Sequence, residues 1–125
     1  MIHTLELWRE CDAEPTHTDD EGSLRQLIAH DSASLLLADH GGRVVGSVIA
    51  AWDGWRGSIY RLVVAPELRR QGLGCRLSIA AESRLREAGA ERCQAIVVET
   101  DAQAVGFWGA SGWERQVKRL RYVKG

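Results

Sequence analysis

The sequence predicts a mixed α/β (α+β) fold, in which a mixed β-sheet carries helices on both of its faces. Two observations support this. Residues 34–39 and 43–52 are rich in apolar side chains and flank His40-Gly41-Gly42, a pattern typical of an antiparallel hairpin. Residues 59–112 then follow the order strand, helix, strand, helix. That order requires a right-handed crossover connection and a parallel pair of strands.

The N-terminal elements are predicted from shorter patterns. Residues 3–9 carry leucines two positions apart, which favours a first β-strand. Residues 12–21 are polar and acidic and predict a loop. This loop leads into a helix that ends at His30, with Asp19 or Asp20 available as its N-cap.

The second half of the chain gives stronger signals. Residues 59–64 form an apolar, β-branched run, and Pro66 ends it because proline has no N–H for a strand ladder. The elements expected after it are a helix over 73–88 ended by Gly89, a strand over 93–99, a short helix ended by Gly112, and one or two strands over 113–123. The apolar side of the helix over 73–88 is expected to contain Leu73, Leu77, Ala80, Ala81, Leu85 and Ala88.

Length and composition indicate a single domain spanning residues 1–125. No apolar run approaches the roughly 18 residues of a membrane span, and no secretory signal pattern begins the chain. The 3 cysteines lack C-x-x-C spacing, which argues against a disulfide framework and a zinc knuckle. The 4 histidines are scattered without ligand spacing, so no metal site is expected. These observations predict a reduced, cytoplasmic protein without a membrane partner.

Charge is distributed unevenly along the chain. Residues 1–42 carry nine acidic and two basic residues, whereas residues 43–125 carry eight acidic and fourteen basic residues. This segregation is either chance, or the basic part handles an anionic cofactor while the acidic part faces a cationic molecule. The acidic residues that would favour a cationic acceptor are Glu6, Glu10, Asp12 and Glu14. The basic C-terminal segment more often protects a sheet edge than binds nucleic acid, so no nucleic-acid partner is expected.

Residues 69–74 (Arg-Arg-Gln-Gly-Leu-Gly) form a basic, glycine-bearing turn between a strand and a helix. Such a turn suits phosphates, because glycine lets the backbone approach an anion and a helix start offers unpaired N–H groups. A P-loop would need Lys and Ser or Thr after its last glycine, and a dinucleotide fingerprint would need a third glycine in place of Leu77. The pattern that fits is R/Q-x-x-G-x-G/A, with Arg69, Gly72 and Gly74 in the fixed positions.

With its flanks, this turn resembles the acetyl-CoA motif of the GCN5-related N-acetyltransferase (GNAT) family. Residues 62–66 resemble the family's fourth strand, and residues 35–46 resemble its second and third strands. Residues 101–113 resemble the family's N-x-x-A-x-x-F-Y-x-x-x-G-F element with three substitutions. The resemblance covers residues 2–123. The short length and residues 7–12 and 53–58 resemble the small bacterial YpeA-type branch.

The resemblance implies a splayed sheet, in which acetyl-CoA fills the gap between two parallel strands. It also implies an acyltransferase that, without a metal, transfers the acetyl group directly to a primary amine of a small molecule or a protein. The backbone N–H of Val64 would hold the oxyanion. The cofactor-binding residues that the resemblance implies are Leu62, Val63, Val64, Arg69, Arg70, Gln71, Gly72, Leu73, Gly74, Cys75, Asp101 and Trp108.

Two positions depart from the family's pattern. The tyrosine that many members use to protonate the departing thiolate corresponds to Trp108, whose indole N–H does not release a proton near neutral pH. The strand that often supplies a general base has no Asp or Glu from position 54 to position 66, although Ser58 stands near that place. Glu99 is the best remaining carboxylate, either as a base or as a solvated strand end. Asp101 fits a helix N-cap better than a catalytic role.

These departures leave an alternative function open: a non-catalytic acyl-CoA-binding sensor or partner module. Three further expectations concern the surroundings of the site. Trp8, Trp52 and Trp55 line an acceptor pocket or belong to the core. Cys75 is a small packed residue. Small family members often pair through their C-terminal strands, so the resemblance also favours a homodimer.

Overall fold

The structure is a computed structural model of the 125-residue chain, and it describes residues 2–11 and 19–125. The chain divides into two compact units, Met1–Ala95 and Ile96–Gly125, and each is described by itself. Most of the acidic loop predicted over residues 12–21 lies outside the described residues. None of the helices in the described part of the chain is long and apolar enough to cross a membrane.

The first unit is built around a four-stranded sheet in the order β1-β2-β3-β4. The strands are β1 (Leu35–His40), β2 (Arg43–Trp52), β3 (Gly57–Val64) and β4 (Cys93–Ala95). The helices of this unit are α1 (Ile2–Glu10), α2 (Glu21–His30), the short 3-10 helix η1 (Pro66–Leu68) and α3 (Leu73–Ala88). β1, β2 and β3 pair antiparallel, whereas β3 and β4 pair parallel. The predicted mixed sheet is therefore confirmed.

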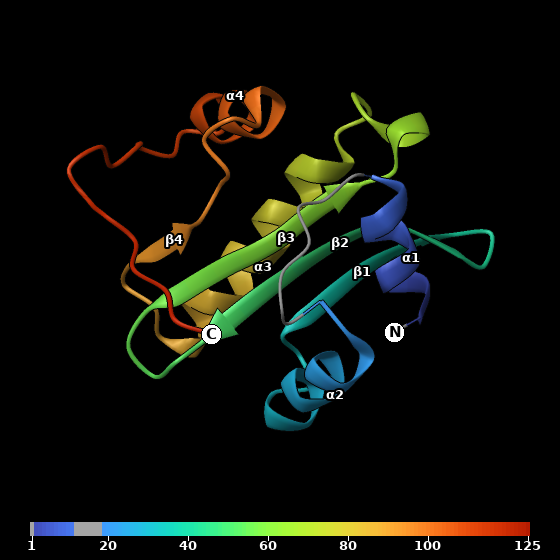
Figure 1. Ribbon diagram of the computed structural model, residues 1–125, viewed down its shortest axis with the longest axis horizontal. Helices are drawn as coiled ribbons and strands as arrows, with labels where there is room; N and C mark the ends of the chain where they lie inside the picture. The colour runs from blue at the N-terminus through green and yellow to red at the C-terminus, as the bar shows by residue number, and fades with distance from the viewer. Residues whose placement is uncertain (1, 12–18) are drawn as a thin grey trace. The chain divides into compact units, whose positions relative to one another are not determined.

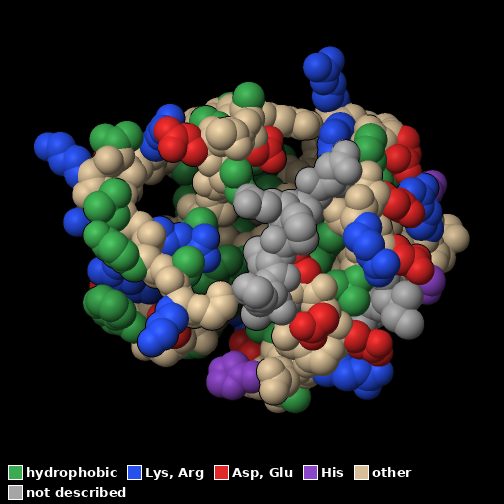
Figure 2. All heavy atoms as spheres, viewed as in Figure 1, with side chains coloured by type: hydrophobic (Ala, Val, Ile, Leu, Met, Phe, Trp, Pro, Cys, Tyr) green, Lys and Arg blue, Asp and Glu red, His purple; other side chains and the backbone are tan. Residues whose placement is uncertain are grey.

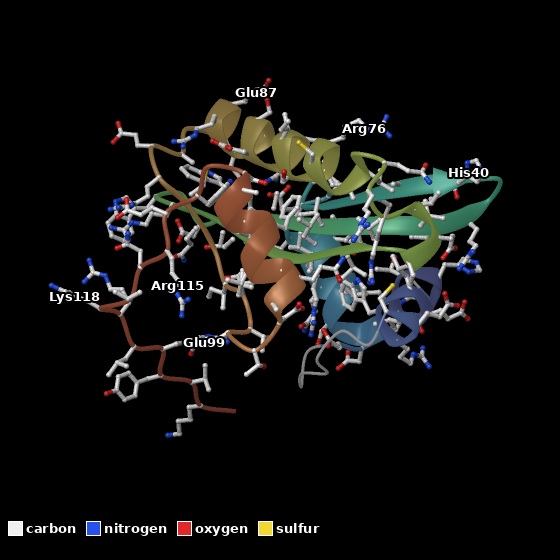
Figure 3. The ribbon with its side chains drawn as sticks, turned by 90° about the horizontal axis from the view of Figure 1, so that it is seen from above. His40, Arg76, Glu87, Glu99, Arg115 and Lys118 are labelled. Atoms are coloured by element: carbon white, nitrogen blue, oxygen red, sulfur yellow. The ribbon has the colours of Figure 1, made fainter. Side chains whose placement is uncertain are left out.

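Helices cover both faces of this sheet, as predicted. Figures 1 and 3 show α3 on one side of the sheet and α1 and α2 on the other. Leu7, Trp8 and Leu24 of α1 and α2 pack in one buried cluster with Val45 and Ile49 of β2. On the other face, α3 buries Leu77, Ser78, Ala81 and Leu85, whereas Ala80 and Ala88 of the predicted apolar side are exposed.

Gly57 of β3 allows α3 to lie close to the sheet. A Cβ atom built at this position would lie 2.7 Å from Cδ1 of Leu85 and 3.0 Å from its Cβ. Leu85 is fully buried, so the glycine provides the space that this leucine fills. The contact fixes the height of α3 above β3, and thereby the position of the turn that precedes the helix.

Residues 2–10 form helix α1, so the predicted strand over residues 3–9 is wrong. Among residues 3–10, the side chains of Thr4, Leu7 and Trp8 are buried, and Cys11 follows them as a half-buried residue. Spacings of three, four and seven residues place all four on one helical face. The two leucines that suggested a strand also fit this helical pattern, and packing against β2 selects the helix.

β3 contains a bulge in its pairing with β2. Ser47 pairs with Val63 and Ile49 pairs with Tyr60, so two residues of β3 lie opposite the single residue between Ser47 and Ile49. Arg61, one of the two, adopts a left-handed backbone conformation with φ of 52°. A bulge of this kind bends the strand and changes the direction of the groups that follow it.

Pairing between β3 and β4 stops early. The last paired residues are Ile59 and Ala95, whereas β3 continues to Val64. β4 is therefore shorter than the strand predicted over residues 93–99. The residues after Ala95 are apolar and β-branched, which suits a strand, but they have no ladder partner. Among the described residues, no strand pairs with residues 60–64 on the β4 side. The parallel pair thus opens into an unpaired edge of β3.

The second unit contains one helix in its described residues, α4 (Ala102–Ala110), which ends before Gly112 as predicted. Residues 113–125, all of which the structure describes, form no strand, so the strands predicted over 113–123 are wrong. Alternating apolar and basic side chains give this segment strand propensity, but a strand also needs a hydrogen-bonded neighbour. Val117, Leu120, Tyr122 and Val123 remain largely exposed.

Candidate active site

Residues 69–72 form the turn that leads from β3 and η1 into α3. Arg70 and Gly72 both adopt left-handed backbone conformations, with φ of 64° and 79°. Gly72 is the N-cap of α3 and has no side chain that could accept the first N–H groups of the helix. The N–H groups of Leu73 and Gly74 therefore point out of the helix end without a side-chain acceptor. A helix start of this kind, at the positive end of the helix dipole, binds anions.

The predicted phosphate-binding residues lie together at this helix start. Arg70, Gln71 and Gly72 are exposed, and Leu73 and Gly74 are half-buried. Cys75 is exposed as well, so the expectation that it is a packed residue is wrong; its position lies on the solvent side of α3. Arg76, an exposed residue in the first turn of α3 (Figure 3), is not among the binding residues predicted from the sequence. Its proximity in sequence to the glycine turn was the available signal.

Arg69 lies differently from its neighbour Arg70. Its Nε donates a hydrogen bond to the carbonyl oxygen of Val64 at 3.2 Å, and its side chain is half-buried. Gln71 adds a similar contact, because its Nε2 donates to the carbonyl oxygen of Glu67 at 3.4 Å. Arg69 thus ties the turn to the end of β3, whereas Arg70 extends from the turn as an exposed cation.

Val64 presents backbone groups at the unpaired edge of β3. The N–H of Ala65 donates to the carbonyl of Val45 in β2 at 2.8 Å. Because this peptide is trans, the carbonyl of Val64 points the opposite way, away from β2. The N–H of Val64 lies on the same side as its carbonyl, since both groups of one strand residue point to the same neighbour. Val64 therefore has an N–H at the edge where the resemblance expects an oxyanion donor.

Cys11 lies beside the same carbonyl. Its Sγ is 3.7 Å from the carbonyl oxygen of Val64. Burial raises the pKa of the Cys11 thiol above its ordinary value, so the group remains an S–H donor at neutral pH. The carbonyl of Val64 thus has two donors, Cys11 and Arg69, and both contacts fix the end of β3.

Leu62 and Val63, the other two predicted residues of this strand, have different roles in the packing. Val63 faces α1, packs against the buried cluster on that face, and pairs with Ser47. Leu62 is half-buried and precedes it in the bulged part of the strand. Strand alternation places the backbone groups of Leu62 at the unpaired edge, as for Val64.

A buried polar cluster holds the bulge. The indole Nε1–H of Trp8 donates to Oγ of Ser47 at 2.8 Å, and Oγ of Ser47 donates to the carbonyl oxygen of Arg61 at 2.9 Å. The Arg61 guanidinium lies 5.3 Å from the centroid of the Trp8 ring and forms an ion pair with Asp19. A left-handed conformation costs a residue such as Arg61 about 1–3 kcal/mol, and these contacts offset that cost.

The tryptophans singled out in the sequence do not line one pocket. Trp8 is 3% exposed and belongs to the core next to the bulge. Trp52 and Trp55 line an open hollow at the other end of β3, where the strand begins. Trp55 is 71% exposed, and the Arg56 guanidinium lies 4.2 Å from the centroid of its ring. This hollow is separated from the glycine turn by the length of β3.

Ser58, which stands near the usual position of the general base, already has a hydrogen-bond partner. Its Oγ accepts from Nε2 of Gln94 at 3.0 Å, in the region where β3 and β4 are still paired. Among the described residues of β3 there is no carboxylate, as the sequence already showed. A base for amine deprotonation must therefore come from another element or from water.

In the second unit, Glu99 is an exposed residue that pairs with Arg115. The distance between Nη2 of Arg115 and Oε1 of Glu99 is 3.0 Å, and both side chains extend into solvent (Figure 3). Both functions considered for Glu99, a base and a solvated strand end, are compatible with this exposure.

Asp101 and Trp108 belong to α4. Asp101 is the N-cap of this helix, and its Oδ1 accepts from the N–H of Ala104 at 3.1 Å. The capping role predicted for Asp101 is therefore confirmed. Trp108 is half-buried between Phe107 and Trp113, with edge-to-face ring centroid distances of 5.4 and 4.9 Å. These contacts hold the indole ring in place within the second unit.

The folded chain brings N-terminal acids and later arginines together. Glu10 pairs with Arg43 at 3.1 Å, and Asp31 forms an ion pair with Arg84. Figure 2 shows acidic and basic side chains interspersed over the visible surface. At these pairs the charges that are segregated along the sequence neutralise each other, which favours the chance explanation. Asp12 and Glu14, two of the acids considered for a cationic acceptor, lie outside the described residues.

A mixed sheet whose parallel pair opens along β3, followed by a glycine turn into a helix, is the arrangement of acyl-CoA N-acyltransferases, and solved structures of this class share the fold. An aminoglycoside acetyltransferase from an uncultured soil metagenomic sample, in complex with trehalose, is 20% identical, with a TM-score of 0.74 over 99% of this chain and 88% of that one. PaiA N-acetyltransferase from Thermoplasma acidophilum, in complex with coenzyme A, is 16% identical, with a TM-score of 0.75 over 87% of this chain and 80% of that one. Ard1 from Thermoplasma volcanium is 20% identical, with a TM-score of 0.74 over 89% and 76% of the two chains.

The chain belongs to the acetyltransferase (GNAT) family, whose model matches residues 2–113. This match includes the strand β3, the glycine turn, and the helices α3 and α4. The family resemblance found in the sequence is thereby confirmed. Within the described residues, no group of three or more His, Cys, Asp or Glu side chains is placed to hold a metal ion.

Proposed function

We propose that this protein is an acetyl-CoA-dependent N-acetyltransferase, one domain over residues 1–125, that transfers the acetyl group directly to a primary amine of a small molecule or a protein. One observation carries the proposal. The left-handed turn at Arg70 and Gly72 leads into an uncapped helix start, next to the unpaired edge of β3. Membership of the acetyltransferase family supplies the reaction class.

The turn fits the pyrophosphate of a CoA thioester. A Cβ atom built at Gly72 would meet no atom within 4 Å, so the space in front of the helix start is open to a ligand. Backbone N–H groups of residues 70–75 would hold the phosphate oxygens. The exposed guanidinium groups of Arg70 and Arg76 would add charge-assisted hydrogen bonds. Arg69 would support the turn through its contact with Val64.

The unpaired edge of β3 fits the pantetheine arm. The backbone N–H of Val64 and the carbonyl of Leu62 at this edge would pair with the amides of an extended ligand, in the manner of strand addition. The carbonyl of Val64 already accepts from Arg69 and Cys11, so it would hold the end of β3 in place while neighbouring backbone groups bind the ligand. The acetyl group would then lie where β3 and β4 separate.

The transfer itself breaks the C–S bond of the thioester and forms a C–N bond. The amine gives up a proton, and the thiolate leaves with the bonding electron pair and is protonated afterwards. A backbone N–H of β3 would stabilise the oxyanion. Glu99 would accept the amine proton directly or through water. Because Trp108 cannot donate a proton, the thiolate would take its proton from water. The reaction would then lack the rate acceleration that a positioned acid provides, which is about 10²- to 10⁴-fold.

An amine screen tests this proposal. Purified protein is incubated with acetyl-CoA and primary amines of different charge and size, and CoA release is followed with a thiol reagent. We expect release with at least one amine, and loss of this release in the Gly72→Asp variant. Binding of acetyl-CoA without release for any amine would instead support the sensor function. The observation that favours this second candidate is the absence of a carboxylate from β3 together with the indole at position 108.

A further inference from the structure

A chain of three contacts ends on the peptide that joins Arg61 to Leu62, just beyond the point where β3 leaves β4. Ser47 donates to the Arg61 carbonyl oxygen, Trp8 donates to Ser47, and the Arg61 guanidinium lies over the Trp8 ring. Ser47 is fully buried and Trp8 is 3% exposed. Neither side chain lies at the surface where a substrate could touch it, so any effect on chemistry must act through the peptide that they hold.

The cluster determines the direction of this peptide. Oγ of Ser47 accepts the indole N–H of Trp8, and its own hydrogen is therefore directed to the Arg61 carbonyl. Since the peptide is trans, the N–H of Leu62 points away from Ser47 and from β2. Strand alternation gives the same direction independently, because the next residue, Val63, pairs with Ser47. The Leu62 N–H is thus aimed at the unpaired edge.

Leu62 is closer than Val64 to the fork between β3 and β4. An extended thioester whose phosphates bind at the glycine turn would reach along β3 past Val64 before its acyl end arrives at the fork. Val64 therefore adjoins the arm of the ligand, and Leu62 adjoins its acyl end. Bulges beside reaction centres commonly re-aim one backbone group in this way.

We propose that Ser47, oriented by Trp8, is a positioning residue for acetyl transfer. It fixes the Arg61–Leu62 peptide so that the Leu62 N–H donates to the carbonyl oxygen of the thioester and to the oxyanion formed on it. This inference rests on the proposed N-acetyltransferase function and names the residues that orient its oxyanion donor. Ser47 itself does not touch the substrate.

The test compares Ser47→Ala with Ser34→Ala. Ser34 is a matched control, because it is also buried and its Oγ also donates to a backbone carbonyl, that of Asp31, at 2.8 Å. We expect Ser47→Ala to lower kcat at least about tenfold, since a misplaced donor loses most of its effect, while acetyl-CoA affinity stays within about twofold of the parent. Ser34→Ala should leave kcat unchanged. Activities are normalised to the folded fraction measured by circular dichroism.

A second variant and a second measurement protect the test against loss of folding and against an inactive parent. Trp8→Phe removes the indole donor and should lower kcat in the same direction. In nuclear magnetic resonance spectra of the parent, the Leu62 amide proton should shift further on addition of acetyl-CoA than of CoA, because only the thioester offers it a carbonyl oxygen, and this difference should vanish in Ser47→Ala.

The two proposals fail in different ways. A parent that turns over while both variants keep its kcat would overturn the positioning role alone. A parent that releases no CoA with any amine would overturn the enzymatic function, and the Leu62 amide shift would then decide the positioning role by itself.

Discussion

Substituting Gly57 by alanine tests the packing that places α3, and with it the glycine turn, on the sheet. The new Cβ would lie 2.7 Å from Cδ1 of Leu85, well inside ordinary contact distance. Leu85 is fully buried, and its Cβ and Cγ would each lie 3.0 Å from the new atom, so rotating the end of the side chain does not relieve the contact. Overpacking of this size costs about 1–3 kcal/mol. Alanine restricts the unfolded chain more than glycine does, and this stabilises the folded state by about 0.4–1 kcal/mol. The net destabilisation expected is therefore about 1–2 kcal/mol.

Urea and thermal unfolding would measure this change, and the expected fall in Tm is about 3–8 °C for a chain of this length. Gly106→Ala is the matched control, because a Cβ there meets no atom within 4 Å, and it should be neutral or stabilising. Leu85→Ala in combination with Gly57→Ala should destabilise less than the sum of the two single changes, by at least about 1 kcal/mol. A Gly57→Ala protein as stable as the parent would refute the close packing of α3 on β3.

Three further predictions concern single contacts. The hydrogen bond from Arg84 holds the pKa of Asp31 below its ordinary value. The pair therefore stabilises the fold above about pH 4, and this stabilisation is lost as the pH falls through the lowered pKa. Asp31→Asn should therefore lower the urea midpoint near neutral pH but not near about pH 2, and an equal effect at both would contradict this. Asp20, whose Oδ1 accepts from the N–H of Ser23 at 2.7 Å, caps α2; Asp20→Ala should cost about 1 kcal/mol, and an unchanged unfolding midpoint would argue against the cap. Trp108→Tyr supplies a group that can protonate the thiolate and should raise kcat at least about tenfold at unchanged acetyl-CoA affinity. An unchanged kcat would exclude an acid at this position.

Local sequence signals predicted those elements that local interactions decide. The helix over 73–88 has the predicted bounds because Gly72 and Gly89 flank an apolar helical pattern. The hairpin of β1 and β2 follows from Gly41 and Gly42. In α1 and in residues 113–123 the pattern suits more than one structure. Packing against β2 makes the first segment a helix, and the lack of a ladder partner keeps residues 113–123 from forming a strand.

The candidate site divides in the same way. The glycine turn before α3 was found from its motif, because the residues that form it are adjacent in sequence; that it binds phosphates stays a proposal. The bulge and its anchor could not be found in this manner, since Trp8 is 39 residues from Ser47 and Ser47 is 14 residues from Arg61. A single signal was present: Ser47 is a polar residue inside the apolar run of β2. The homodimer and the base role of Glu99 stay predictions.

Binding of acetyl-CoA at the glycine turn is the central claim, and a calorimetric titration tests it most directly. Three proteins are compared: the parent, Gly72→Asp, and Gly54→Asp. Gly54 is the matched control, since it also has a positive φ, of 92°, and open space around it, but it lies in the turn that precedes β3. We predict that the parent and Gly54→Asp bind acetyl-CoA equally well, and that Gly72→Asp binds at least about tenfold more weakly because its carboxylate repels the phosphates. A folded parent that does not bind, or a Gly72→Asp variant that binds as tightly as the parent, would contradict the account.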